Sequence, residues 1–429
     1  MSASELEEHG PSVTRAWVLH PDITSDRARR AAGPALQEAI ALAEALPGLE
    51  IAGSGVVPLA KARPGYLFGS GKIDELGALF RDAEVELVLI DGPVTPVQQR
   101  NLERDWKVKI LDRTGLILEI FADRARTREG VLQVELAALS YQRTRLVRAW
   151  THLERQRGGL GFVGGPGETQ IEADRRAIDE AITRLRRQLS KVVKTRDLHR
   201  AARRKVPFPV VALVGYTNAG KSTLFNRLTG AQVLAKDMLF ATLDPTMRAV
   251  TLPSGLKVIL SDTVGFISEL PTQLVAAFRA TLEEVLEADL ILHVRDIAHS
   301  GTEEQAEDVR AILSELGVAS QTPVIEVWNK TDLVSPENRA ALEALAARHE
   351  GVLTLSAWTG EGMEPLLAAV TAALDDARSR TELFLGFDEG RKRAWLFEQG
   401  VVEDERPQEN GYRLNVNWTA RQQSRFREM

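Results

Sequence analysis

The sequence predicts an α/β fold: an N-terminal parallel-sheet domain with a long antiparallel helical hairpin, a second and larger α/β domain, and a small C-terminal α+β or β-rich appendage. Three observations lead to this prediction. Short apolar runs alternate with helical patterns over residues 16–122 and again after residue 208. Between these regions, apolar residues recur at steps of three and four. A strand, a glycine-rich loop ending in Lys-Ser and a helix follow one another from residue 209 onward.

The composition is typical of a globular protein with sizeable cores. The chain has 429 residues, of which 44% are hydrophobic and 27% are charged. The N-terminus is acidic and lacks the features of a secretory signal, and no apolar run is long enough for a membrane helix. There is no cysteine, which excludes disulfides, thiolate zinc sites and cysteine nucleophiles. We therefore expect a cytoplasmic protein without a membrane span.

The repeated β-α pattern predicts a small parallel sheet in the N-terminal part. The expected strands are AWVLH, EIAGSGVVPL, ELVLIDG and KVKILDR, and the expected helices are RRAAGPALQEAIALAEAL, KIDELGALFRDA and PVQQRNLERDW. Within this part, YLFGSGKIDEL places Lys72 near a glycine loop that could hold an anion or a second nucleotide. A plain tight turn is the favoured interpretation, because a short glycine loop is a weak signal by itself.

Residues 130–204 are predicted to form two paired helices. Their apolar seams are Leu132, Leu136, Leu139, Leu146, Trp150 and Leu153, then Ile178, Ile182, Leu185, Leu189 and Val192. Between the seams lies GGLGFVGGPGETQ, residues 158–170, whose glycines and proline cannot continue a helix. A loop longer than a turn requires usually has a function.

The hairpin region is strongly basic. Residues 123–205 contain 20 Lys and Arg against 10 Asp and Glu, a local charge of +10 in a chain whose net charge is −6. This segregation predicts a surface that contacts a polyanion, and a solvated helical face is the alternative. Arginines pair with phosphates, and small residues let the backbone approach RNA closely. The expected RNA-binding residues are Arg155, Arg157, Gly158, Gly159, Gly161, Gly164, Gly165 and Gly167.

GYTNAGKS follows the apolar strand PVVALV and precedes the helix TLFNRL, which is the context of a phosphate-binding loop. Gly215 and Gly220 let the backbone curl so that its N–H groups face the β-phosphate. Lys221 is expected to bridge the β- and γ-phosphates, and Ser222 to offer its hydroxyl to magnesium.

NKTD follows the strand PVIEVW and selects the base. The Asp332 carboxylate can accept hydrogen bonds from guanine N1–H and the 2-amino group, whereas adenine would leave it unpaired. Asn329 and Lys330 brace the pocket. In SAWTG, the backbone N–H groups of Ser356 and Ala357 are expected near guanine O6. These elements predict a GTPase domain.

Two segments are candidates for sensing the third phosphate. Asp262 ends the strand VILSD and is placed to hold magnesium, and Gly265 can offer its N–H to the γ-phosphate. In LFATLDPT, Thr242 is the chosen second magnesium ligand and Thr246 the alternate. Phe266 follows the switch glycine, where many GTPases have a water-orienting glutamine. Either the protein does not hydrolyse its nucleotide, or another group positions the attacking water.

The predicted site can now be given in full. Expected catalytic residues are Lys221, Thr242 and Gly265. Expected magnesium ligands are Ser222, Thr242 and Asp262. Expected GTP-binding residues are Gly215, Tyr216, Thr217, Asn218, Ala219, Gly220, Lys221, Ser222, Thr223, Phe240, Ala241, Thr242, Asp262, Thr263, Val264, Gly265, Asn329, Lys330, Asp332, Ser356, Ala357 and Trp358.

Three segments together resemble the HflX family of ribosome-associated GTPases: DRTGLILEIFADRARTREGVLQVELA, HLERQRGGLGFVGGPGETQIEADRR and DTVGFISELP. The resemblance covers about residues 16–376. It implies that the helical N-terminal region docks on the large ribosomal subunit and reaches toward the peptidyl-transferase centre. It also implies that the protein splits stalled or idle ribosomes into subunits, especially under stress.

The resemblance also bears on hydrolysis. Family members have an apolar residue after the switch glycine, as Phe266 is here, so backbone groups, another side chain or the ribosome must place the water. Asn218 stands at the fourth position of GYTNAGKS, as in GTPases that bind a potassium ion beside the phosphates. Stabilisation of the turn is the alternative role for this asparagine.

We expect a monomer in four parts, at residues 1–129, 130–205, 206–376 and 377–429. In the last part, the alternation of Tyr412, Leu414, Val416 and Trp418 with polar residues predicts a half-exposed strand. Two other functions stay open. One is a GTPase that assembles or parks the large subunit, and the other is an RNA-remodelling NTPase with a second N-terminal nucleotide site.

Overall fold

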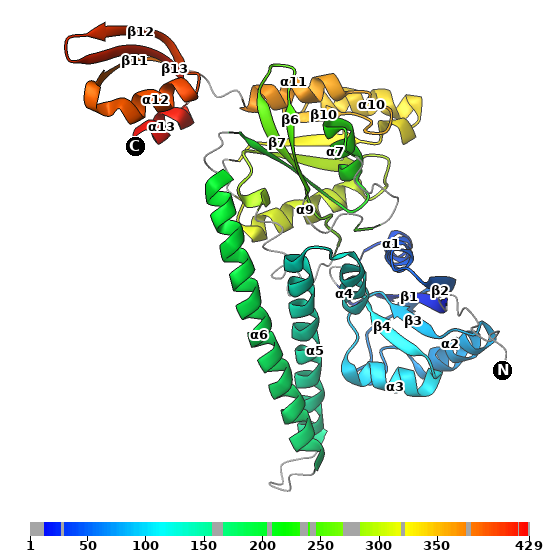
Figure 1. Ribbon diagram of the computed structural model, residues 1–429. Coiled ribbons are helices and arrows are strands. Elements are labelled where there is room, and N and C mark those ends of the chain that lie inside the picture. Colours follow the sequence, from blue (N-terminus) through cyan, green and yellow to red (C-terminus); the bar gives the residue numbers. More distant parts are fainter. Residues whose placement is uncertain are drawn as a thin grey trace, which may run out of the picture. The chain divides into compact units, whose positions relative to one another are not determined.

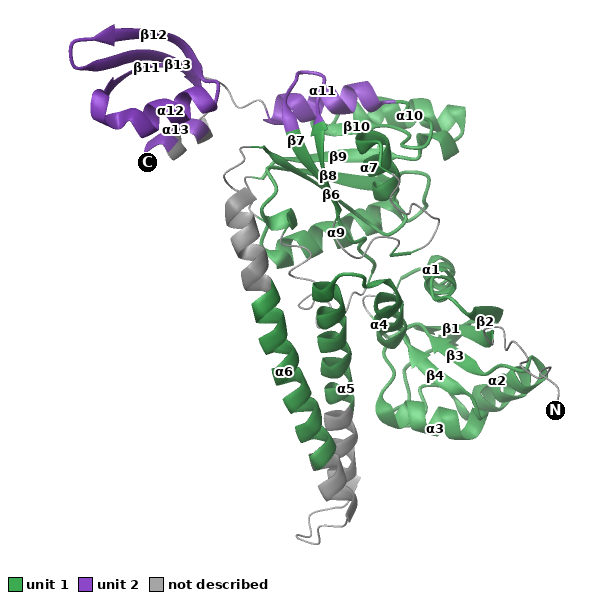
Figure 2. Cartoon of the chain, viewed as in Figure 1, with its two compact units in different colours: residues 1–250, 258–361 green, residues 251–257, 362–429 purple. Residues whose placement is uncertain are grey.

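The computed structural model describes residues 13–26, 30–156, 166–203, 208–231, 239–240, 246–268, 284–318, 322–374, 379–418 and 420–427. Along residues 146–156, 166–172 and 193–203 it describes the course of the helices alone. The chain forms two compact units, coloured separately in Figure 2. Unit 1 comprises residues 1–250 and 258–361, and unit 2 comprises residues 251–257 and 362–429.

Unit 1 begins with a parallel sheet in the strand order β2-β1-β3-β4, drawn in blue and cyan in Figure 1. Its strands are β1 (Thr14–Ile23), β2 (Leu49–Leu59), β3 (Leu87–Ile90) and β4 (Lys109–Asp112). Its helices are α1 (Ala32–Glu44), α2 (Ser70–Asp82), α3 (Pro96–Trp106) and α4 (Arg113–Arg124). Buried side chains of α1 and α4 belong to one core cluster and those of α2 and α3 to another, so helices cover both faces. This arrangement confirms the predicted N-terminal parallel α/β fold.

Local chemistry explains where two of these helices begin. At α3, the Gln98 N–H donates to Thr95 Oγ1 at 3.3 Å and the Thr95 N–H donates to the Gln98 side chain at 2.8 Å. With Pro96 in the first turn, this capping box starts the helix where the sequence predicts it. Helix α4 is not anticipated by the sequence pattern, because Asp112 both ends β4 and caps α4 by accepting the Gly115 N–H at 2.8 Å.

Helices α5 (Arg128–Gln156) and α6 (Pro166–Arg203) lie side by side and form the predicted hairpin, as Figure 1 shows. Ile182 is buried, and Arg143 on α5 forms an ion pair with Asp179 on α6 at 3.0 Å. Helix α6 begins at Pro166, so the expectation that residues 166–170 are loop is wrong. Proline suits the first turn of a helix because it lacks an N–H there.

The second sheet of unit 1 has the order β10-β9-β8-β5-β7-β6. Its strands are β5 (Val210–Gly215), β6 (Thr246–Thr251), β7 (Lys257–Asp262), β8 (Leu290–Asp296), β9 (Val324–Asn329) and β10 (Val352–Thr354). Its helices are α7 (Lys221–Thr229), α9 (Thr302–Leu316), η1 (Thr331–Leu333) and α10 (Pro336–Ala346). Strand β5 pairs in parallel with β7 on one side and β8 on the other. The loop after β5 therefore lies at the carboxyl ends of central strands, where open α/β sheets bind ligands.

Unit 2 contains an antiparallel sheet of order β11-β13-β12. Its elements are α11 (Met363–Leu374), β11 (Ser379–Gly386), η2 (Phe387–Glu389), α12 (Gly390–Glu398), β12 (Val402–Gln408), β13 (Gly411–Trp418) and α13 (Ala420–Arg427). Leu414, Val416 and Trp418 are buried, whereas Arg413 and Asn415 are exposed. The predicted β-containing appendage is thus confirmed. Across the described ranges of both units, no helix combines the length and apolar composition needed to cross a membrane.

Candidate functional site

The loop between β5 and α7 is closed by two glycines that no other residue can replace without strain. Gly215 has φ +152°, and a Cβ built there would lie 2.1 Å from the Val294 carbonyl oxygen. Gly220 has φ +91°, and a Cβ there would lie 2.2 Å from Asn329 Nδ2. The close approach of the β8 backbone therefore requires glycine at position 215, and the left-handed backbone favours it at position 220.

Lys221 is buried at the first residue of α7. Its Nζ donates to the Gly215 and Tyr216 carbonyl oxygens at 3.2 and 2.7 Å. Burial lowers the pKa of Lys221 to about 8, and the charge of Asp262 acts in the opposite direction. The ammonium group is thus held inside the loop, where it can meet phosphate oxygens.

Two oxygen ligands suited to magnesium lie together beside this lysine. The Ser222 hydroxyl donates to Asp262 Oδ2 at 2.8 Å, and Asp262 is fully buried at the end of β7. Hydroxyl and carboxylate oxygens are the donors that Mg²⁺ prefers, so these residues fit the ion that GTPases of this fold generally use. Bound there, the ion would supply positive charge that offsets the phosphate charge of the nucleotide.

The segment after β7 is docked on the phosphate loop by main-chain hydrogen bonds. The Phe266 N–H donates to the Gly215 carbonyl at 3.1 Å, and the Thr217 N–H donates to the Phe266 carbonyl at 2.7 Å. Gly265 therefore lies close to Thr217 and Lys221, and a Cβ there would come within 2.9 Å of Thr217 Cα. Phe266 itself is 1% exposed and packs in the core. Its side chain anchors the segment and does not face the reacting phosphate.

The base-recognition motif is assembled from the ends of β9 and β10. Asn329 links it to the phosphate loop, because its Nδ2 donates to the Ala219 carbonyl at 2.8 Å and its Oδ1 accepts the Ala357 N–H at 2.9 Å. Ser356 Oγ donates to Asp332 Oδ1 at 2.6 Å and thereby orients the carboxylate. Lys330 adopts a left-handed conformation with φ +65°. These contacts bring the NKTD and SAWTG motifs together as the sequence predicts.

Two residues that sequence reasoning missed support this pocket. Arg227 on α7 donates from Nε to the Ala357 carbonyl at 2.7 Å and also bonds the Trp358 carbonyl. Asp296, at the end of β8, forms an ion pair with Lys330 Nζ at 2.8 Å. Neither belongs to a sequence motif, so only its position at the strand and helix ends identifies it. Trp358, which follows Ala357 in the SAWTG motif, has 78% of its surface exposed.

The remaining predicted residues lie in different surroundings. The side chains of Thr263, Val264 and Phe240 are buried, and Phe240 packs against Phe121 with ring centroids 4.6 Å apart. Asn218 is exposed with φ +59°, Thr223 is partly buried in α7, and Thr246 opens β6. Ala241 and Thr242 lie outside the described residues, as do Arg157, Gly158, Gly159, Gly161, Gly164 and Gly165. Arg155 and Gly167 lie on the described course of α5 and α6.

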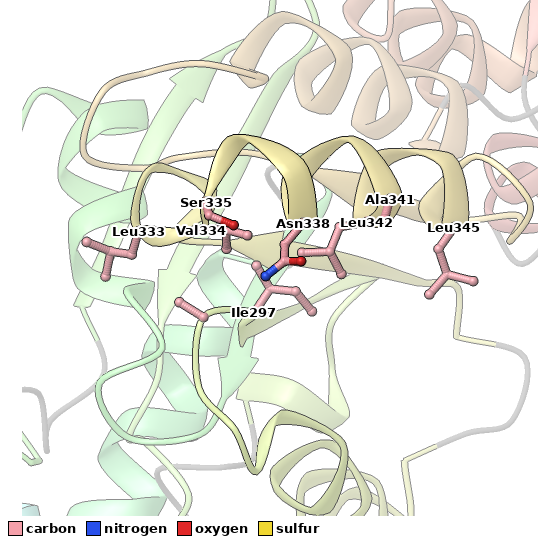
Figure 3. A pocket seen from close by; sticks show the side chains of 9 residues that line it. Ile297, Leu333, Val334, Ser335, Asn338, Ala341, Leu342 and Leu345 are labelled. Atoms are coloured by element: carbon pink, nitrogen blue, oxygen red, sulfur yellow. The ribbon is translucent and has the colours of Figure 1, made fainter.

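An apolar hollow lies next to this site but does not belong to it. It has a volume of about 510 Å³ and is shown in Figure 3. Its lining consists of Ile297, Ala298, Leu333, Val334, Ser335, Asn338, Ala341, Leu342 and Leu345. None of the predicted phosphate-binding or base-binding residues contributes to this lining, and it contains no charged side chain.

Four family descriptions match consecutive parts of the chain. They are "GTP-binding GTPase N-terminal" at residues 34–122, "GTP-binding GTPase Middle Region" at 124–203, "50S ribosome-binding GTPase" at 210–330 and "HflX C-terminal domain" at 341–428. A protein of Magnetococcus marinus described as GTPase HflX is 52% identical over 90% of this chain and 87% of its own length. The chain belongs to the HflX family of GTPases.

Two further proteins are similar to this chain. The GTPase HflX of Escherichia coli is 46% identical over 81% of each chain. A crystal structure of a GTP-binding protein from the archaeon Sulfolobus solfataricus with GDP is 24% identical, covering 84% of this chain and 98% of that chain with a TM-score of 0.45.

As an HflX family member, the protein is a GTPase that converts GTP and water to GDP and phosphate. The geometry around β5 suits this reaction. The Lys221 ammonium is held against the loop carbonyls and Ser356 orients the Asp332 carboxylate, an arrangement that suits a phosphate chain and a guanine base. Phe266 occupies the position after Gly265, so a group other than a glutamine at this position must place the attacking water.

Proposed function

We propose that this GTPase binds the large ribosomal subunit and splits stalled or idle ribosomes into subunits, under stress conditions. The observation that carries the proposal is the basic hairpin joined to a GTPase domain whose family description is "50S ribosome-binding GTPase". Helix α6 has 38 residues, which at 1.5 Å per residue gives a length of about 57 Å. A helix of this length can carry a tip far from the nucleotide site.

In this proposal the tip and the shaft of the hairpin have different tasks. The tip, with Arg155, Arg157 and the glycines of residues 158–167, enters a narrow RNA-lined site. The basic shaft holds phosphates without reading sequence, and its affinity falls steeply with salt because counterions are released on binding. GTP bound at Lys221 fixes the GTPase domain, so that docking of the tip drives the subunits apart.

The test compares two variants that remove the same charge from the same hairpin. Arg155→Ala/Arg157→Ala alters the tip, whereas Arg184→Ala/Arg187→Ala alters exposed positions of α6. Purified ribosomes are sedimented with each protein in GTP, GDP and a non-hydrolysable GTP analogue. We expect the tip variant to lose subunit separation by at least about tenfold, while the shaft variant loses mainly salt-dependent affinity.

The outcome decides between the proposal and its alternatives. If the tip variant splits ribosomes as well as the native protein, the tip is only a connector and the mechanism is wrong. If the native protein binds the large subunit but never separates intact ribosomes, it is an assembly or subunit-parking GTPase.

We further propose the ions and groups that serve hydrolysis. Ser222 and Asp262 hold Mg²⁺ together with Thr242, and Gly265 donates its N–H to the γ-phosphate. Asn218 holds a potassium ion that neutralises transition-state charge, for which its exposed position on the phosphate loop is suitable. Turnover in potassium should then exceed turnover in sodium, and Asn218→Ala should erase the difference. Equal turnover of the native protein in both salts would exclude the potassium site.

The N-terminal sheet gives the RNA-remodelling alternative no support. Lys72, the residue that suggested a second nucleotide site, forms an ion pair with Glu75 on its own helix at 2.8 Å. We therefore propose a single guanine nucleotide site, in a protein that acts as a cytoplasmic monomer.

A further inference from the structure

A closed network of buried polar groups lies at the carboxyl edge of the first sheet. Four residues form its ring, and we call them the edge clamp: Glu38 on α1, Arg113 at the start of α4, Tyr216 in the phosphate loop, and Ser268 at the end of the switch segment, residues 262–268. Arg30 donates to both Glu38 and Ser268 Oγ from outside this ring. All four belong to unit 1. The clamp therefore connects the N-terminal sheet with both nucleotide-binding segments of the second sheet.

Each polar atom of Ser268 is held by the clamp. Ser268 Oγ donates to Glu38 Oε1 at 2.8 Å and accepts from Arg113 Nη2 at 3.0 Å. The Ser268 N–H donates to the Tyr216 hydroxyl at 2.7 Å, and the Ser268 carbonyl accepts from Arg113 Nη2 at 3.0 Å. The Tyr216 hydroxyl donates to Glu38 Oε2 at 2.8 Å and closes the ring. This backbone position cannot shift without breaking several buried hydrogen bonds.

The edge clamp contains a charged pair, Arg113 and Glu38, and Arg113 is also paired with a residue outside the clamp. Arg113 is 5% exposed and pairs with Glu38 and with Asp91, whose Oδ1 lies 2.6 Å from Arg113 Nη1. Burial acts to raise the pKa of Glu38, but the charges of Arg113 and Arg30 hold it below its ordinary value. Burial raises the pKa of Tyr216, and the Glu38 charge adds to the effect. Glu38 is thus an anion and Tyr216 a hydrogen-bond donor over the working pH range.

The edge clamp lies at the carboxyl ends of the strands of the first sheet. Asp91 follows β3 and Arg113 follows β4, at the edge where parallel α/β sheets bind their ligands. Here the Ser268 backbone takes that position. Ser268 is three residues after Gly265 and two after Phe266, whose main chain pairs with the phosphate loop. The segment is therefore held at Phe266 by backbone pairing and at Ser268 by the clamp.

We propose that Glu38 and Arg113 are positioning residues for GTP hydrolysis, acting through Ser268 and Tyr216 to hold the Gly265 N–H in place. With no glutamine after Gly265, a backbone held in a fixed geometry can lower the barrier instead. The inference rests on the GTPase activity and is independent of ribosome splitting. It is tested with the full chain and GTP alone, without ribosomes.

The first experiment compares two tyrosines that each donate to a carboxylate in unit 1. Tyr216→Phe removes the hydroxyl between Glu38 and Ser268. Tyr141→Phe, the control, removes a hydroxyl that bonds Asp112 at 2.6 Å and has no hydrogen bond to the switch residues that the structure describes. We expect Tyr216→Phe to lower kcat by about tenfold with GTP and GDP affinities within about threefold of the native values, since the loop backbone is kept. Tyr141→Phe should leave kcat unchanged.

A double-mutant cycle identifies action through the clamp. Ser268→Ala and Glu38→Gln should each lower kcat, and the double variant should lower it no further than the stronger single variant. Ser268→Ala keeps the test valid if Glu38→Gln folds poorly. An unchanged or raised kcat in Ser268→Ala and Tyr216→Phe overturns the proposal. So does a loss of kcat that is matched by an equal loss of GTP and GDP affinity, which marks a merely structural role.

Discussion

The two sheets of unit 1 carry different groups at the carboxyl ends of their parallel strands. After β5, the edge consists of a glycine-closed loop with the buried Lys221, and beside it Ser222 and Asp262 present oxygen ligands. After β3 and β4, the edge carries Asp91 and Arg113, which are bonded to each other and to other side chains. One edge is shaped for a triphosphate, and the other is filled by the protein's own residues.

Two short sequences show why the difference is not one of composition. GSGK at the start of α2 and NAGKS at the start of α7 both place a lysine after glycines. A Cβ at Gly71 would meet nothing within 4 Å, whereas one at Gly220, where φ is +91°, would lie 2.2 Å from Asn329 Nδ2. Lys72 forms an ion pair with Glu75, whereas Lys221 donates to the Gly215 carbonyl of its own loop. Whether a glycine-lysine sequence forms a phosphate site thus depends on its backbone conformation and surroundings.

The largest expected effect separates the two lysines. Lys221→Ala should lower kcat/KM for GTP by about 10³-fold, because it removes a charge that contacts the transferred phosphoryl group. Lys72→Ala should stay within about twofold of the native protein, since an exposed ion pair contributes little. Steady-state phosphate release measures both. A comparable loss in Lys72→Ala would place nucleotide chemistry at the first sheet.

The glycines sharpen the comparison through stability. Gly215→Ala should lower the free energy of unfolding by about 3 kcal/mol, because a Cβ at this φ meets the Val294 carbonyl. Gly71→Ala lies in the first turn of α2 with free space around it and should raise stability by up to about 1 kcal/mol. Urea unfolding followed by circular dichroism gives both values. Equal tolerance at the two sites would show that the loop is not constrained as described.

Two carboxylates that follow strands provide the third comparison. Asp332→Asn should weaken GTP binding by about 10²-fold and favour xanthosine triphosphate, whose oxygen can accept from the new amide. Asp91→Asn should leave nucleotide affinity unchanged and lower stability by about 2–4 kcal/mol, because it deprives the buried Arg113 of a charged partner. Calorimetric titration measures the nucleotide affinity of both variants, and unfolding experiments measure their stability. Unchanged GTP affinity in Asp332→Asn would remove the base-pocket assignment.

The smallest expected effect is the uptake of a proton by Lys221 when nucleotide binds. The pKa of Lys221 is lowered from 10.5 to about 8 by burial, and phosphate oxygens should raise it on binding. Nucleotide binding should therefore take up about 0.9 proton at pH 9 and only about 0.1 at pH 7, so affinity falls as the pH rises above about 8. Titration in buffers of different ionisation enthalpy measures the uptake. Its absence at pH 9 would mean that Lys221 stays charged without nucleotide.

Much of this architecture can be predicted from sequence because its causes are local. The Thr95-Pro96 start of α3 and the GYTNAGKS loop are each specified by adjacent residues. Prediction fails where one residue has two roles, as Asp112 does between β4 and α4, or where a pattern is short, as in β6. It also misses Arg227, because a carbonyl 130 residues away gives that arginine its role.

The edge clamp could not be predicted either, because its residues come from distant parts of the sequence. Glu38 and Arg113 are 75 residues apart, and Arg113 and Ser268 are 155 residues apart. No spacing rule connects such positions, and each looks like an ordinary surface residue in its own segment. Only the packing of the first sheet's edge against the switch segment brings them together.

The most direct test of this account is amide hydrogen exchange across residues 262–268. If the first sheet's edge holds the switch segment, the Ser268 and Phe266 amides should exchange slowly in the native protein. They should exchange at least about tenfold faster in Tyr216→Phe and Ser268→Ala, with the amides of β5 unchanged and Tyr141→Phe identical to the native protein. Exchange at Ser268 and Phe266 that is equally fast in the native protein and in these variants would contradict the central claim.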